Sequence, residues 1–352
     1  MTDNDAGLQI VDKLFEKLMI DEPWAIRRPR GFTWWSYRLA QHVEAGPMTL
    51  DRGMQISRVR IWTEVVNGVD ESSRPAEWLA VGNARQTLNA LTWDPARGTV
   101  TECCTAVIHD ENVGWMSKLL SIAAVMQNAG AHSRARALAD LLRGEAAVSS
   151  HPISGERPQP DDILGVPEHV IAAAGKENSH FVGPLTQGLE ASLRKWLFLG
   201  SAEADGMTCE VPFTGSSPAA VEVALGVDPH RPPETCLVRI FSDVEHPDYG
   251  HGALLVMMLP VNFPDQEVAA VANELNLLEA TTEIPTELLG AWCLDPTCEP
   301  KTRIAFNAFL PNIVAEPNLL ENMILLQAAR SQYFGADGAE HLPRFGGEGP
   351  NG

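Results

Sequence analysis

The sequence has 352 residues, of which 45% are hydrophobic and 20% are charged. This is the composition of an ordinary globular protein, and it excludes the fibrous, collagen-like and largely disordered classes. The 26 lysines and arginines stand against 46 aspartates and glutamates, and the resulting net charge of −20 argues against a general attraction to nucleic acid or anionic lipid.

The N-terminal segment, the lengths of the apolar stretches and the number of cysteines together predict where in the cell the protein is found. The N-terminal segment has no basic region before its apolar residues, so we expect no signal peptide. We expect no membrane insertion, because no apolar stretch approaches the roughly 18 to 20 residues that a membrane span needs. Six cysteines are too few for a disulfide framework and are typical of a reduced compartment. We therefore expect a cytoplasmic protein.

The first half of the chain changes between helical and strand periodicity. Apolar residues at the spacing of one helical face predict an opening helix, and alternating residues after Gly31 predict strands. The predicted elements are a helix over 8–18, strands over 33–43 and 55–66, a helix over 75–89, strands over 91–93 and 99–108, and a long helix over 113–143.

A stretch rich in proline, glycine and polar residues follows over 149–163 and predicts a linker. The tail over 337–352 is expected to be disordered. Between them the predicted elements are helices over 167–174 and 186–199, strands over 207–213, 219–225, 235–242 and 252–261, a helix over 265–280, strands over 289–294 and 302–310, and a helix over 317–334.

The order of elements in the two halves, and some of their residues, predict a tandem duplication. Residues 79–83 (LAVGN) resemble 269–273 (AAVAN) in the middle helix, and 93–95 (WDP) resemble 294–296 (LDP) in a later turn. The predicted domains are 1–148 and 164–336, joined by the linker. The second copy is expected to contain an extra hairpin before its middle helix.

This order, the acidic charge and the lack of catalytic motifs resemble the type III secretion chaperone-like fold, including YbjN-like proteins. Residues 290–293 (GAWC), the strand over 305–310 and the closing helix look like the last three elements of such domains. The resemblance implies an α+β fold of two tandem α-β-β-β-α-β-β-α type domains, each an antiparallel sheet packed with helices. It also implies an intramolecular pseudo-dimer that holds an extended segment of a client protein, and it leaves further oligomerisation open.

Alternation along the first two predicted strands gathers aromatic and basic side chains on one face. Tryptophan and arginine are the residues most enriched at the hot spots of protein interfaces, which predicts a partner-binding face. The alternative is a face that packs against the second copy or is simply solvated. The candidate partner-binding residues are Trp34, Arg38, Arg58, Arg60 and Trp62.

A second polar cluster offers oxygen and imidazole ligands that a divalent metal would accept. Its spacing matches no known structural site, and the turn-forming residues within it favour a polar turn at a hairpin tip. We therefore expect no metal, with Asp243, Glu245, His246 and His251 as the weak candidates. We expect neither a cofactor nor catalytic residues, because no phosphate-binding loop, HExxH or GxSxG motif is present.

The sequence thus predicts a non-enzymatic cytoplasmic protein that binds another protein, as a chaperone or adaptor, including one linked to secretion. We expect no nucleic-acid partner. Two alternatives stay open: a small-molecule-binding or enzymatic protein with a site between the two copies, and a structural subunit of a larger assembly.

Overall fold

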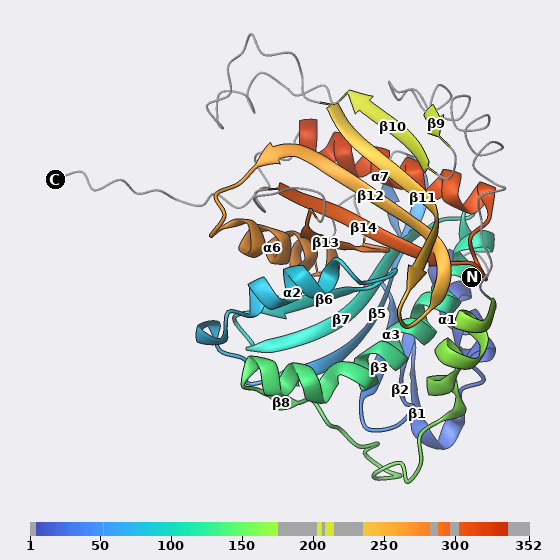
Figure 1. Cartoon of the computed structure of the whole chain (residues 1–352). Coiled ribbons are helices and arrows are strands. Elements are labelled where there is room, and N and C mark those ends of the chain that lie inside the picture. The colour runs from blue at the N-terminus through green and yellow to red at the C-terminus, as the bar shows by residue number, and fades with distance from the viewer. Residues whose placement is uncertain are drawn as a thin grey trace.

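The computed structural model describes residues 5–51, 53–174, 203–205, 208–214, 235–281, 288–295 and 303–336. Two antiparallel sheets packed with helices make up a mixed α+β fold (Figure 1), which confirms the predicted fold class. The predicted helix over 186–199, the strand over 219–225 and the tail over 337–352 lie outside the described residues. Within the described ranges, no helix is both long enough and apolar enough to cross a membrane.

The first half of the chain builds one sheet with the strand order β1-β2-β3-β5-β7-β6, and β4 and β8 both pair with β5. Its elements are α1 (Ala6–Lys17), η1 (Glu22–Trp24), β1 (Ala25–Arg28), β2 (Gly31–Trp35), β3 (Ala40–Ala45), β4 (Thr49–Asp51), β5 (Met54–Asn67), η2 (Glu71–Ser73), α2 (Pro75–Asn83), β6 (Ala90–Asp94), β7 (Thr99–Ile108), α3 (Val113–Leu142) and β8 (Glu145–Ala146).

The second half builds a sheet with the order β9-β10-β11-β12-β14-β13. Its elements are the short helical turns η3 (Asp162–Gly165), η4 (Pro167–Ile171) and η5 (Ala172–Ala174), then β9 (Glu203–Asp205), β10 (Thr208–Thr214), β11 (Thr235–His246), β12 (Gly250–Asn262), α6 (Val268–Thr281), β13 (Ala291–Leu294), β14 (Arg303–Pro311) and α7 (Pro317–Ala336).

The two sheets therefore have the same strand order. In each, four neighbouring strands come first, a helix follows, and the last strand of a closing hairpin pairs with the fourth strand. In the first half, the predicted strand over 33–43 is two strands, β2 and β3, and β1 precedes them. The described part of the second half therefore has no extra hairpin relative to the first, and the predicted strand over 219–225 lies outside the described residues. Duplication itself stays a prediction.

The chain turns between β2 and β3 because α3 holds the connecting residues. The hydroxyl of Ser36 donates to the side chain of Asn128 at 2.9 Å, and the backbone N–H of Leu39 donates to Nε2 of His132 at 3.2 Å. Both of these partners lie on α3. A contact from far along the sequence thus replaces the glycine or proline that usually marks such a turn.

The two halves pack closely on each other. Each middle helix contacts the other half's edge strand: α2 packs against β13, and α6 packs against β6. The helices α2 and α6 also lie side by side (Figure 1). In a two-fold interface between like units, each unit makes the same contact with the other, as these two helices do. The largest hydrophobic cluster includes described residues of both halves.

Three asparagine side chains hydrogen-bond the backbone of the edge strands that meet at this interface. Asn83 of α2 bonds both the N–H and the C=O of Leu91 on β6, each at 2.9 Å. Asn276 of α6 does the same for Trp292 on β13, at 2.8 Å. Asn273 reaches across the interface to Trp93 on β6, at 2.9 and 3.0 Å. These amides satisfy edge peptide groups that would otherwise be buried without a partner.

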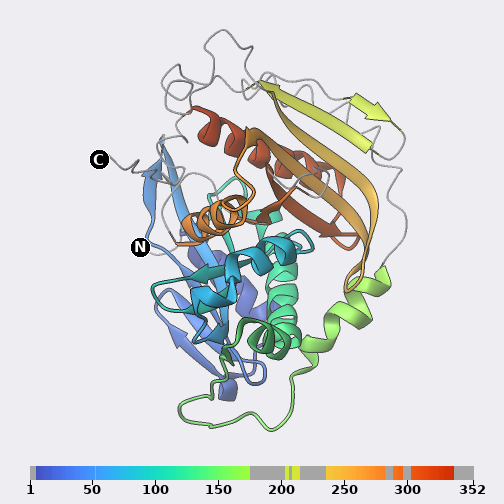
Figure 2. The ribbon, with the colours of Figure 1, turned by 60° about the vertical axis from the view of Figure 1, so that its left-hand side comes forward.

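The predicted linker over 149–163 packs against the first half. Arg157 donates to Asp21 and to the backbone oxygen of Trp35, both at 3.0 Å, and to Asp161 at 2.7 Å. Figure 2 shows this segment looping beneath the first half and then rising as η3–η5 beside the hairpin of β11 and β12.

Candidate functional site: the outer face of the first sheet

The strand β5 divides its side chains between two environments. Val59, Ile61 and Thr63 are buried toward α1 and α3, whereas the alternate residues of this strand are half-buried on the opposite side. Alternation is the ordinary consequence of strand geometry. We define the outer face by the residues on that opposite side and their neighbours on β1, β2 and β3: Arg28, Thr33, His42, Glu44, Arg58, Arg60, Trp62 and Glu64.

Three side chains form a stack at the centre of this face. His42 and Trp62 are directly opposite each other on β3 and β5, and their ring centroids are 5.0 Å apart with an angle of 23° between the planes. The guanidinium of Arg60 lies 4.7 Å from the centroid of Trp62. Nδ1 of His42 hydrogen-bonds Oγ1 of Thr33 at 2.9 Å. The indole of Trp62 is therefore held by two neighbours before any partner arrives.

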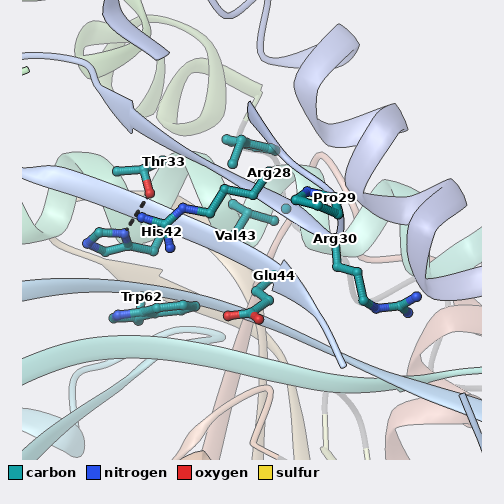
Figure 3. A pocket seen from close by; sticks show the side chains of 10 residues that line it. Arg28, Pro29, Arg30, Thr33, His42, Val43, Glu44 and Trp62 are labelled. Carbon is teal, nitrogen blue, oxygen red and sulfur yellow. Dashed lines mark hydrogen bonds between the residues drawn. The ribbon is translucent and has the colours of Figure 1, made fainter. Parts of the chain in front are cut away.

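A hollow of about 250 Å³ opens beside the stack, at the turn between β1 and β2 (Figure 3). The side chain of Arg28 extends across it toward Thr33 and His42, whereas Arg30 points away (Figure 3). Arg30 is held by Asp5 at 2.8 Å and by the backbone oxygen of Ala45 at 2.8 Å. The lining residues are Arg28, Pro29, Arg30, Gly31, Phe32, Thr33, His42, Val43, Glu44 and Trp62.

The charges on the outer face favour an anion. Arg28 is exposed, and Glu64 already forms an ion pair with Arg97. Burial is the main cause that lowers the pKa of His42; Glu64 acts in the opposite direction, and Arg28 and Arg60 lower the pKa further. The imidazole is therefore neutral at neutral pH, and the positive charge of the face resides on its arginines.

Three of the five predicted site residues share this face, and two do not. Arg58, Arg60 and Trp62 lie together as predicted. Trp34 is fully buried on the inner face, and its Nε1 donates to Asp21 at 3.2 Å. Arg38 is exposed in the bend between β2 and β3. The prediction failed for both because it assumed one strand where the chain reverses.

Arg28 and His42 belong to the outer face but were not among the predicted site residues. His42 is on the strand that pairs with β5, in register with Trp62. Arg28 lies on β1, an edge strand of four residues that is too short for a periodic pattern. The basic run Arg27-Arg28-Pro29-Arg30 was the signal available in the sequence.

The four weak metal candidates do not converge on one point. Nδ1 of His251 lies 2.7 Å from Asp243, and Glu245 is exposed. His246 turns away, with Nε2 bonded to the backbone oxygen of Arg85 at 2.8 Å. In the part of the chain that the structure describes, no group of three or more histidine, cysteine or acidic side chains could hold a metal ion.

A second cluster of titratable groups joins β7 and α3 of the first half. Glu102 of β7 is fully buried, and burial raises its pKa to about 7 although Arg134 of α3 is 3.5 Å away. A Cβ at Gly130 would lie 3.0 Å from Oε1 of Glu102 and 2.9 Å from the guanidinium of Arg134.

The buried cysteines offer no nucleophile. Burial raises the pKa of Cys103 to about 12 and also raises the pKa of Cys293. Both side chains therefore stay protonated at neutral pH, and a thiol is a far weaker nucleophile than a thiolate.

No protein-family model, no curated protein and no solved structure matches the chain. The outer face and its chemistry are therefore the basis for assigning a function.

Proposed function

We propose that this chain is a non-catalytic protein-binding protein, a cytoplasmic chaperone or adaptor, and that its partner docks on the outer face. The observation that carries the proposal is the preorganised stack of His42, Trp62 and Arg60 on a half-buried sheet face. Tryptophan and arginine are enriched among the few residues that supply most of the binding energy at protein interfaces. Holding them in place beforehand lowers the entropy cost of binding.

The resemblance to the type III secretion chaperone-like fold gives this proposal a more specific form. Each half would be one chaperone-like domain, and the two together would make the client-binding unit, including for a protein destined for export. Support comes from the strand order shared by the two sheets and from the reciprocal packing of α2 and α6. Among the described residues, four neighbouring strands of each sheet precede the middle helix, one more than the resemblance implies, and β4 adds a fifth in the first half.

The other two functions have less support in the structure. An enzyme with a site between the halves would need titratable groups from both of them, whereas Glu102 and Arg134 both come from the first half. A structural subunit would bury its docking surface permanently in a large apolar interface. The outer face instead carries charged side chains along β5, which are more typical of a partner that comes and goes.

The test is affinity capture of the tagged full-length protein from its own cell extract, followed by mass spectrometry. One variant combines Trp62→Ala with Arg60→Ala. The matched control combines Trp78→Ala with Arg136→Ala, which removes the same residue types from exposed positions on α2 and α3. We expect a stoichiometric partner that the control retains and the outer-face variant loses. Equal retention by both variants would place the partner elsewhere.

A further inference from the structure

We propose that the segment bound by the outer face is acidic and extended, with carboxylates that pair with Arg28 and Arg60. An apolar or planar side chain of the same segment would rest beside Trp62. This inference rests on the proposed function and names the chemistry of the partner.

The first argument is charge complementarity. The whole chain has a net charge of −20, yet arginines outnumber acidic residues on the outer face. Of the two acidic residues there, Glu64 is already paired with Arg97. A face whose charge is opposite to that of the rest of the molecule selects its partner by electrostatic complementarity.

The second argument is an unsatisfied donor. Nε of Arg60 is buried and has no hydrogen-bond partner among the described residues. A buried donor without an acceptor costs free energy, and native structures seldom leave one. Nε itself is buried, but Arg60 as a whole is only half-buried, so a carboxylate arriving from solvent can pair with the guanidinium through a charge-assisted hydrogen bond, which is stronger than one between neutral groups.

The third argument is the shape of the face. The hollow of about 250 Å³ beside His42 is large enough for one side chain with a few waters, and Arg28 extends across it (Figure 3). Two members of the stack, His42 and Trp62, line the same hollow. Arg28 and Arg60 lie in one row across β1, β2, β3 and β5, so a segment that crosses these strands would place one carboxylate in the hollow beside Arg28 and another above Arg60.

A nucleic-acid backbone also carries anions, but the molecule disfavours it. A long polyanion would extend beyond the outer face, where the negative charge of the rest of the chain would repel it. Screening at moderate salt confines attraction to roughly 10 Å, so a short acidic peptide gains the local attraction with less of the distant repulsion.

The experiment measures the fluorescence anisotropy of a labelled 12-residue peptide in which glutamate alternates with serine around one central phenylalanine. Matched peptides carry glutamine or lysine in place of glutamate, and a labelled oligothymidylate tests the nucleic-acid alternative. The protein is the full-length chain, at about 150 mM salt to screen distant charges. We expect the glutamate peptide to bind about tenfold more tightly than the glutamine peptide, as two or three charge-assisted bonds imply.

Binding of the glutamate peptide is also measured for two charge-reversal variants on the outer face and for one control variant elsewhere on the surface. Arg60→Glu and Arg28→Glu should each weaken binding of the glutamate peptide at least about fivefold, by losing a charge-assisted bond. Arg136→Glu makes the same charge change at an exposed position on α3 and should leave binding unchanged. Arg28 is exposed on a short edge strand, so its variant keeps the test valid if Arg60→Glu unfolds.

Three results would overturn the inference: equal binding of the glutamine or lysine peptide, tighter binding of the oligothymidylate, or equal weakening by Arg136→Glu. The capture experiment separates this failure from that of the proposed function. If the partner is lost from the Trp62 and Arg60 variant while the glutamate peptide does not bind, only the acidic character of the partner is wrong. If capture is unchanged by that variant, the proposed function is wrong as well.

Discussion

Two tryptophans of the first sheet have opposite environments, because they project from opposite sides of it. Trp34 is fully buried in the core, whereas Trp62 is half-buried on the outer face. We expect Trp34→Ala to lower the free energy of unfolding by about 3–5 kcal/mol, the usual cost of removing a buried aromatic side chain. Trp62→Ala should lower it by only about 1 kcal/mol.

Urea denaturation of the two variants measures both values. A loss from Trp62→Ala as large as that from Trp34→Ala would mean that the outer face is part of the core and is not a docking surface. The comparison is matched because the residue type and the substitution are the same.

Glu102 makes stability depend on pH. Its ordinary pKa is 4.5, and in the folded chain burial raises the pKa to about 7. As pH rises, the unfolded chain therefore loses this proton first, and the free energy of unfolding falls between about pH 4.5 and 7. The loss attributable to this group is up to about 3 kcal/mol, and it levels off above pH 7.

Comparison of the wild type with Glu102→Gln at pH 5 and pH 8 isolates this effect. We expect the free energy of unfolding of the wild type to fall between pH 5 and pH 8 by more than that of the variant. The variant should therefore compare more favourably with the wild type at pH 8 than at pH 5. A difference that does not change with pH would show that Glu102 titrates near its ordinary value and that Arg134 compensates for its burial.

At the residue scale, the alternation of side chains could be predicted from the sequence, but the turn between β2 and β3 could not. Arg58, Arg60 and Trp62 share a face because β5 runs without a break. Trp34 and Arg38 were misplaced because bonds from α3 hold the turn. Contacts this distant in sequence leave no local signal.

At the scale of elements, the side chain of Asn273 joins the two halves by hydrogen bonds to both backbone groups of Trp93. Asn273→Ala would leave a buried N–H and a buried C=O without partners. We expect the free energy of unfolding to fall by about 2–4 kcal/mol, since each unsatisfied group costs roughly 1–3 kcal/mol.

Denaturant unfolding checks this value, and Asn276→Ala is the reference variant. That variant breaks the same kind of contact within one half. A negligible effect of Asn273→Ala alone would mean that water replaces the lost bonds at the interface.

The predicted repeat matches residues 79–83 to 269–273, which pairs Asn83 with Asn273. In the structure, the contacts of Asn83 are instead shared by Asn276, because each bonds the edge strand of its own half. Asparagine occurs at both positions of α6, and the sequence does not show which one faces its own strand.

At the scale of the whole molecule, both halves contribute to the largest hydrophobic cluster. We therefore expect a single cooperative unfolding transition in calorimetry of the full chain. A fragment of residues 1–163 should fail to fold, because it would expose the apolar surfaces of α2, β6 and α3 that the second half covers.

Two resolved transitions, or a cooperative transition in the fragment alone, would instead support two independent domains. Composition and length predicted two units. They could not predict that the units share a core, because which apolar surfaces meet depends on how the two sheets are placed.

The asparagine contacts also bear on self-association. A sheet grows from one molecule to the next by adding strands at an open edge, which is how fibrils begin. At β6 and β13, amide side chains already occupy backbone groups that an incoming strand would use. At the opposite end of the first sheet, β1 is only four residues long and is flanked by Pro23 and Pro29. The fold thus limits fibril growth at each of these three edges.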